Sequence, residues 1–139
     1  MKHARGTFEV KVTPQKPDNK DAEGANFGRM SLNKQFHGDL EGTSLGEMLG
    51  ATTDIKGSAG YVALERVTGT LDGKTGTFVL QHSGTMTRGG LQLHVTVVPD
   101  SGTGELVGIA GRMDIKIEGA KHFYDFEYSI AEATLKPAK

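Results

Sequence analysis

The sequence predicts an all-β protein, a single closed antiparallel barrel of eight strands with one short helical plug. Three observations predict it. Segments of alternating apolar and polar residues recur along the chain, a period typical of half-buried strands. Glycine-rich turn signals separate these segments at even spacing, and the chain of 139 residues contains 20 glycines. Eight strands close without leaving sheet edges, and they enclose room for packed side chains or one small ligand.

The first three strands are expected at residues 6–13, 27–37 and 40–51. Pro14 and Pro17 are predicted to end the first strand because proline cannot donate to a ladder. The polar stretch 15–25 is predicted to be a mobile loop. Glycines 42 and 46 in the third strand are candidates for β-bulges.

Lys34 is an exception in the second strand, because it shares a face with Met30, Leu32 and Phe36. A two-residue turn at Gly38-Asp39 would place Glu41 diagonal to Lys34, so that the two charges could pair. The alternative is that Lys34 extends along apolar surface to the barrel rim and keeps its ammonium group in water.

The central strands are predicted with a defined register. Asp72-Gly73 is a strong signal for a two-residue hairpin, because a type I′ turn needs positive φ at both central residues. A second turn is expected at Arg88-Gly89-Gly90. Both turns agree with the apolar alternation on either side of them, which supports the register. One face, expected to be interior, carries Tyr61, Ala63, Glu65, Val67, Phe78, Leu80, His82, Met86, Leu91, Leu93, Val95 and Val97.

Glu65 and His82 therefore lie diagonally across neighbouring strands, with Tyr61 beside His82. Diagonal neighbours are roughly 7–8 Å apart at the backbone, a gap that long side chains bridge. A carboxylate and an imidazole on an interior face are candidates for acid–base chemistry or ligand binding. The alternative is a buried pair that only fixes the register.

The last third of the chain contains the plug and two further strands. Pro99 ends the sixth strand, and Ser101 or Thr103 is expected to cap a short helical turn through Leu106. A seventh strand carries Met113, Ile115 and Ile117, and an eighth places its alternate residues inside, namely His122, Tyr124, Phe126, Tyr128 and Ile130. Residues 132–139 are expected to be a tail, and the whole chain, 1–139, one domain.

Composition excludes several functions. The chain contains no cysteine and therefore no disulfide framework or thiolate nucleophile. Its net charge of −1 is spread along the chain, so no basic face predicts nucleic-acid binding. No apolar run is long enough to cross a membrane, and no signal peptide is evident, so a cytoplasmic protein is expected. The histidines show no metal-ligand spacing, and neither metal nor cofactor is expected.

Two short motifs do not predict chemistry here. Residues 42–46 match G-x-S-x-G, but that motif needs a strand-to-helix turn in an α/β sheet, whereas these residues lie in a glycine-rich strand. Gly-Lys-Thr at 73–75 has the wrong glycine spacing for a P-loop and precedes a strand.

Three longer runs carry a family resemblance: YVALERVTGTLDGKTGTFVLQHSGTM, VVPDSGTGELVGIAG and HFYDFEY. The sequence resembles a bacterial family of unknown function that is grouped structurally with the allene oxide cyclase-like barrels. The resemblance covers roughly residues 6–130 and implies an antiparallel barrel with a partly hydrophobic cavity, in a homo-oligomer. It implies no substrate, because fold alone does not determine function.

Three functions remain open. The first is a barrel that binds a small apolar or amphipathic ligand, with polar groups that fix one end of it. The second is an isomerase, cyclase or lyase in which Glu65 or His82 moves a proton. The third is a structural homo-oligomer with a packed interior. The candidate ligand-binding residues are Glu65, His82, Tyr61, Tyr124, Tyr128, Lys34 and Glu41.

Overall fold

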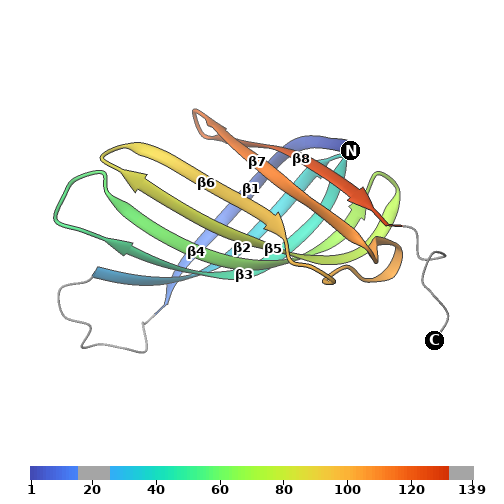
Figure 1. The fold of residues 1–139 in the computed structure, drawn as a ribbon, viewed down its shortest axis with the longest axis horizontal. Helices are drawn as coiled ribbons and strands as arrows, with labels where there is room; N and C mark the ends of the chain where they lie inside the picture. The colour runs from blue at the N-terminus through green and yellow to red at the C-terminus, as the bar shows by residue number, and fades with distance from the viewer. Residues whose placement is uncertain (16–25, 132–139) are drawn as a thin grey trace.

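The structure is a computed structural model that describes residues 1–15 and 26–131. Within these residues, eight antiparallel strands form one closed barrel in chain order, with β8 returning to β1 (Figure 1). The strands are β1 (Lys2–Gln15), β2 (Asn26–Gly38), β3 (Leu40–Thr52), β4 (Ala59–Leu71), β5 (Lys74–Thr87), β6 (Gly90–Val97), β7 (Ile109–Glu118) and β8 (Lys121–Ile130). The predicted fold is confirmed. The expected tail, and the expected loop apart from Gln15, lie outside the described residues.

The central hairpins have the predicted register. Asp72 and Gly73 both have positive φ, 47° and 85°, as a type I′ turn requires. Leu71 pairs with Lys74 beside this turn, and Ala63 pairs with His82 further along the same hairpin. The next turn is Arg88-Gly89, which also has positive φ at both residues. The local turn chemistry therefore places Glu65 and His82 on one face.

Strand β1 differs from its prediction because it continues through Pro14 to Gln15. Its pairing with β8 ends at Phe8, whereas its pairing with β2 continues to Gln15. Pro14 thus lies where β1 has a neighbour on one side, and the missing N–H is tolerated at such an edge.

Glycines 42 and 46 are not bulges, since β3 pairs with β4 without interruption. Both face inward, where the backbones come close together. A Cβ at Gly46 would lie 2.3 Å from the carbonyl oxygen of Leu64 and 2.7 Å from the Cβ of Glu65. Only glycine leaves room for β4 at this point.

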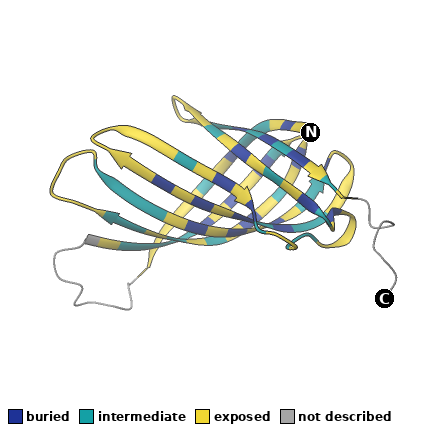
Figure 2. Ribbon diagram, viewed as in Figure 1, coloured by how far each residue is buried: buried dark blue, intermediate teal, exposed yellow. Residues whose placement is uncertain are grey.

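The barrel interior has a packed half and an open half. The packed half lies under the β2–β3 and β4–β5 turns, and its core includes Phe36, Leu71, Phe78, Phe126 and Tyr128. The open half lies toward the β3–β4 and β5–β6 turns, where Figure 2 shows mostly exposed and intermediate positions. Inward-facing side chains there reach water: Met86 is 39% exposed, Leu91 59% and Ile117 61%.

The closure between β6 and β7 is slight. Both strands lie within the described range 26–131, and their ladder consists of one pair, Thr96 with Arg112. The two strands diverge from this point toward the open half (Figure 1). We call this weakly paired β6–β7 junction the seam. It opens toward the same half of the barrel as the exposed apolar interior.

The plug is a 3₁₀ turn, η1 (Gly104–Leu106), with Leu106 fully buried. The expected capping is wrong, because Thr103 makes no side-chain cap. Its hydroxyl instead accepts a hydrogen bond from the backbone N of Thr77 at 3.1 Å, and that of Ser101 accepts one from Val79 at 3.0 Å. These hydroxyls accept hydrogen bonds from the part of β5 before Leu80, where β5 has no ladder with β6. In the two described ranges, no helix is long and apolar enough to span a bilayer.

Candidate functional site

The candidate site is a buried polar cluster between the two halves of the interior, formed by Glu65, Lys34, His82 and Ser44. Glu65 is 1% exposed and is contacted by the other three side chains. Lys34 Nζ lies 2.7 Å from Oε2, and His82 Nε2 lies 2.5 Å from the same oxygen. Ser44 Oγ donates to Oε1 at 2.7 Å. The carboxylate is thus fully engaged by donors from β2, β3 and β5.

The registers of four strands bring this cluster together. Lys34 on β2 pairs with Ser44 on β3, and Glu65 on β4 lies opposite Gly46, two residues further along β3. Because Gly46 has no side chain, Lys34 can reach Glu65 across β3, and Ser44 reaches it diagonally from β3 itself. His82 then approaches Glu65 from β5, as the diagonal arrangement predicts.

The cluster keeps Glu65 ionised. Burial alone would raise the pKa of this carboxyl, but the hydrogen bond from His82 and the charge of Lys34 outweigh it. The pKa falls from the ordinary 4.5 to about 2. Glu65 is therefore a carboxylate at neutral pH and can only accept hydrogen bonds.

The carboxylate fixes the tautomer of His82. At 2.5 Å from an acceptor-only oxygen, Nε2 must carry a proton. The other ring nitrogen of His82, Nδ1, lies 3.4 Å from the hydroxyl of Tyr61. Burial, followed by the charge of Glu65, raises the pKa of Tyr61 and keeps its phenol protonated. The three residues form a chain from the carboxylate to a half-buried hydroxyl.

Tyr61 lies on the open side of the cluster. It pairs with Gly84, where an added Cβ would lie 2.4 Å from the tyrosine ring. On the other side of Gly84 in the sheet is Leu93, which is partly exposed. Met48 also faces inward on this side, from β3. Apolar side chains from β6 and β3 therefore lie on the open side of Tyr61.

Lys34 is buried on the packed side of the cluster. Its side chain is 6% exposed, and its ammonium lies 4.8 Å from the ring centre of Phe8 and 5.9 Å from that of Phe36. Cation–π contacts of this kind are favourable for a desolvated ammonium. The suggestion that Lys34 extends to the rim is therefore wrong.

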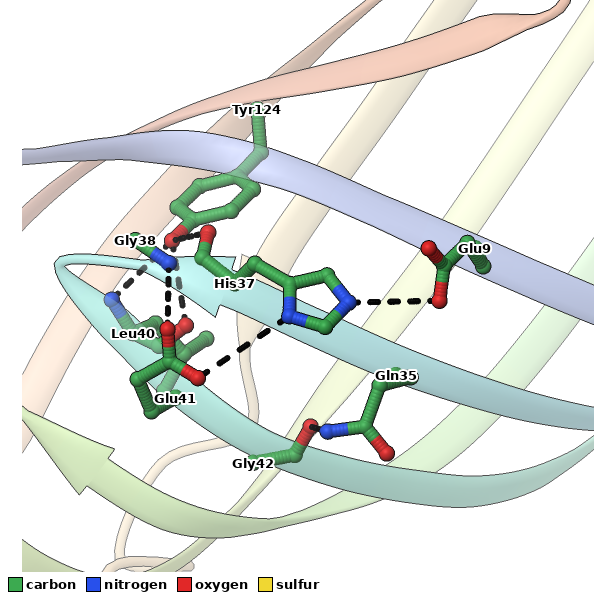
Figure 3. Close-up of polar contacts among 8 residues, drawn as sticks. All are labelled: Glu9, Gln35, His37, Gly38, Leu40, Glu41, Gly42 and Tyr124. Carbon is green, nitrogen blue, oxygen red and sulfur yellow. Dashed lines mark hydrogen bonds and ion pairs between the residues drawn. The ribbon is translucent and has the colours of Figure 1, made fainter.

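The predicted pairing of Lys34 with Glu41 is also wrong. Phe36 pairs with Gly42, one residue later than a two-residue turn would give, so Glu41 faces outward. One of its carboxylate oxygens accepts a hydrogen bond from Gly38 N at 2.9 Å, and the other lies 4.0 Å from His37 Nδ1 (Figure 3). Glu41 therefore stabilises the turn outside the barrel.

Tyr124 and Tyr128 lie in the packed half, apart from the cluster. The Tyr124 hydroxyl donates to the carbonyl of His37 at 2.9 Å and accepts from the backbone N of Leu40 at 3.0 Å (Figure 3). The Tyr128 hydroxyl donates to Asp72 at the β4–β5 turn. Burial raises the pKa of both, that of Tyr124 to about 12. The Tyr124 hydroxyl therefore stabilises the β2–β3 turn, and the Tyr128 hydroxyl stabilises the β4–β5 turn.

Sequence reasoning missed Ser44 as a partner of Glu65, and it missed the contact between Lys34 and Glu65. A signal was present. Ser44 alternates with Gly42 and Gly46, which indicates an inward face with room for neighbouring side chains. To predict the contact from this signal, the register between β2 and β3 had to be known, and the turn at Asp39 determines that register.

The cluster contains one histidine and one carboxylate, a set suited to proton transfer and hydrogen bonding. Among residues 1–15 and 26–131, no three His, Cys, Asp or Glu side chains are grouped so that they could hold a metal ion.

Comparison with known proteins places the chain in a family. No curated protein matches it. A crystal structure of a protein of unknown function from the DUF3224 family, from Shewanella oneidensis MR-1, is 52% identical. The match covers 96% of this chain and 99% of that one, with a TM-score of 0.91. The similarity to allene oxide cyclase barrels stays a prediction. A model described as a protein of unknown function, DUF3224, matches residues 4–128, and the chain belongs to this family.

Proposed function

We propose that this protein binds a small apolar or amphipathic molecule in the open half of its barrel, with one polar end directed at Tyr61 and the cluster behind it. One observation carries the proposal. Inward-facing apolar side chains that a packed barrel would bury are exposed to water on the side from which Tyr61 is reached. Apolar surface that faces inward around a few fixed polar groups is typical of ligand sites.

The charges in the cluster support the same proposal. Removing a carboxylate and an ammonium from water costs several kcal/mol per ion, and their attraction repays this only when their geometry is good. Three donors on Glu65 meet that condition. The Lys34–Glu65 ion pair is a fixed dipole that would orient a ligand bound in the open half. Apolar residues at these positions would serve a barrel that needed only stability.

The first test is native mass spectrometry of protein purified gently from its own host, with organic extraction of whatever it retains. A discrete small-molecule mass supports the proposal and gives the chemical class of the ligand.

A matched pair of variants locates the site. Leu93→Trp fills the space beside Tyr61, and Gln92→Trp adds the same bulk to the neighbouring outward position.

Loss of the retained molecule in Leu93→Trp but not in Gln92→Trp is the expected result. Equal retention in both variants would contradict binding at this position. Thermal unfolding of the two variants shows whether either change acts through stability.

A second candidate function is acid–base catalysis, as in an isomerase, cyclase or lyase. The observation that favours it is the pairing of Glu65 with His82 Nε2, which leaves Nδ1, beside the Tyr61 hydroxyl, as the ring nitrogen that would exchange a proton with a substrate, as in other carboxylate–histidine pairs. Once a retained molecule is identified, turnover by wild type and its loss in His82→Gln, with binding largely kept, would support this function. Binding without turnover in wild type would exclude it for that molecule.

We infer a homo-oligomer from the outer face of β3 and β4. Leu45, Leu49, Val62 and Leu64 are each more than half exposed on these adjacent strands. Exposed apolar patches of this kind are typical of interaction surfaces. The mass of the native particle tests this directly, and a monomer would contradict it. The cytoplasmic location stays a prediction.

A further inference from the structure

The seam separates two strands that match each other in length and register. In an antiparallel ladder, each step toward the start of one strand faces a step toward the end of the other. Continued from Thr96 and Arg112, this register places Gly90 opposite Glu118, the first residue of β6 and the last of β7. All of β6 before Thr96 thus has counterparts in β7, and among the described residues none of them forms a ladder pair across the seam.

The inward-facing side chains on the two sides of the seam are matched by the same register. The pairs that it brings together are all apolar, namely Val95 with Met113, Leu93 with Ile115, and Leu91 with Ile117. Exposure rises in step along the two strands, from 2% and 3% in the first pair to 59% and 61% in the last. The second pair is partly buried on both sides. The two strands therefore separate progressively from one end, and their registers stay aligned.

The outward-facing side chains are also compatible with pairing. The same register places His94 opposite Asp114 and Gln92 opposite Lys116, and all four side chains are exposed. An imidazole faces a carboxylate in the first pair, and an amide faces an ammonium in the second. Like charges directly opposite each other destabilise a ladder, and these pairs contain none. Neither face of the seam therefore opposes its closure.

We propose that the seam is the entrance to the open half, and that β6 and β7 close over a bound molecule by pairing in this register. The inference rests on the proposed function and adds how that site opens and closes. Closure around an empty interior would bury Leu91 and Ile117 against unfilled space, and cavities are costly. A molecule in the open half fills that space and contacts these two side chains in the closed form. This difference in contacts shifts the equilibrium toward closure.

The β6 side of the seam is the anchored side. Strand β6 pairs with β5 along its whole length. In the turn before it, the backbone N of Gly89 donates to the carbonyl oxygen of Gly57 at 2.9 Å, and that of Arg88 donates to Ser58 Oγ at 3.1 Å. Beyond Arg112, β7 is paired with β8 alone among the described strands. We therefore expect the β7–β8 hairpin to move toward β6.

A disulfide across the seam reports closure, because the chain contains no cysteine of its own. Gln92→Cys and Lys116→Cys change two outward residues that face each other in the closed form. Facing residues of an antiparallel ladder have Cα atoms about 4.5–5.5 Å apart, a separation that a disulfide spans. We expect 1-naphthol, a small amphipathic probe whose binding is followed by fluorescence, to speed the oxidation of this pair by glutathione disulfide about tenfold.

Two further pairs of substitutions are matched controls. Gln81→Cys with Thr96→Cys joins outward residues that already face each other across β5 and β6, and it should oxidise rapidly with or without the probe. His94→Cys with Lys116→Cys lies out of register across the seam, and it should oxidise slowly in both conditions.

The outcomes separate this inference from the proposed function. If 1-naphthol binds and the pair at 92 and 116 oxidises no faster, the seam inference is overturned and the binding function stands. Oxidation of this pair without the probe, as rapid as that of the β5–β6 control, would also overturn it, since the seam would then be closed without a ligand. A molecule retained from the host takes the place of 1-naphthol in the same test. If 1-naphthol does not bind and the protein retains no molecule, the proposed function fails, and this inference fails with it.

Discussion

Glu65 is the residue on which the cluster depends. It binds Lys34, His82 and Ser44 at once, while almost none of its surface reaches water. Each partner loses its main polar contact if the carboxylate is removed. Leaving a buried charge without its partner is far more costly than exchanging both partners for neutral groups. The four residues should therefore behave as a unit in mutagenesis.

Glu65→Gln should lower the free energy of unfolding by roughly 3–5 kcal/mol, because it leaves the ammonium of Lys34 buried without a counter-charge. In a Lys34→Met background the same substitution should cost about 1–2 kcal/mol less, since no ammonium remains. Urea denaturation of wild type, both single variants and the double variant measures this coupling. Additive costs would show that Lys34 and Glu65 do not stabilise each other.

The low pKa of Glu65 predicts how stability depends on pH. Its folded-state pKa is about 2 against an ordinary 4.5, so its contribution is present above pH 4.5 and lost as the pH falls toward 2. The difference in unfolding free energy between wild type and Glu65→Gln should shrink by about 3 kcal/mol over this window. Denaturation curves recorded between pH 6 and pH 2 test this. A difference that stays constant would place the folded-state pKa near its ordinary value.

At the scale of elements, turns decide what the sequence can predict. Asp72-Gly73 and Arg88-Gly89 determine their own hairpins, so the shared face of Glu65 and His82 follows from local residues. The β2–β3 turn is different. The hydroxyl of Tyr124, which comes 84 residues after Leu40 in the chain, holds it by contacting backbone groups on both sides. The local sequence does not reveal this contact. The sequence-based prediction therefore placed the β2–β3 register wrong by one residue, and this error put Glu41 on the inward face.

Tyr124→Phe should destabilise the protein by about 1–3 kcal/mol, because it leaves the buried backbone N of Leu40 without an acceptor. Hydrogen exchange at the Leu40 amide should become faster. Tyr61→Phe is the matched control, since the Tyr61 hydroxyl makes a long contact to a side chain and should cost much less. Similar losses in both variants would indicate that the Tyr124 hydroxyl has no special role in the turn.

At the scale of the whole molecule, the barrel closes through a weak seam. The fold class, the strand order and the inward faces of the central strands could be predicted, since they follow from period-two patterning and turn chemistry. The seam could not, because β6 and β7 have ordinary strand patterns. Their divergence depends on where the chain between them, including η1, attaches to β5. Lys34 was a predicted site residue, but its contact with Glu65, and Ser44 as a member of the site, required four strand registers to be known together.

The seam predicts uneven hydrogen exchange. Amides in β4, and in β5 from Leu80 onward, which have ladder partners on both sides, should be the best protected, whereas those of β6 and β7 that face the seam should exchange much faster. Native-state exchange followed by NMR measures this. Equal protection on both sides of the seam would show that β6 and β7 pair along their full length.

The measurement that tests the central claim most directly uses the five methionines as reporters. Met30, Met48 and Met86 face inward in the open half, Met113 belongs to the packed core, and Met1 lies exposed at the other end of the barrel. In protein labelled with ¹³C at the methionine methyl groups, 1-naphthol, used as a small amphipathic probe, should shift the signals of the first three. Those of Met1 and Met113 should stay in place. Shifts at Met1 or Met113 alone, or at none of the five, would contradict a ligand site in the open half.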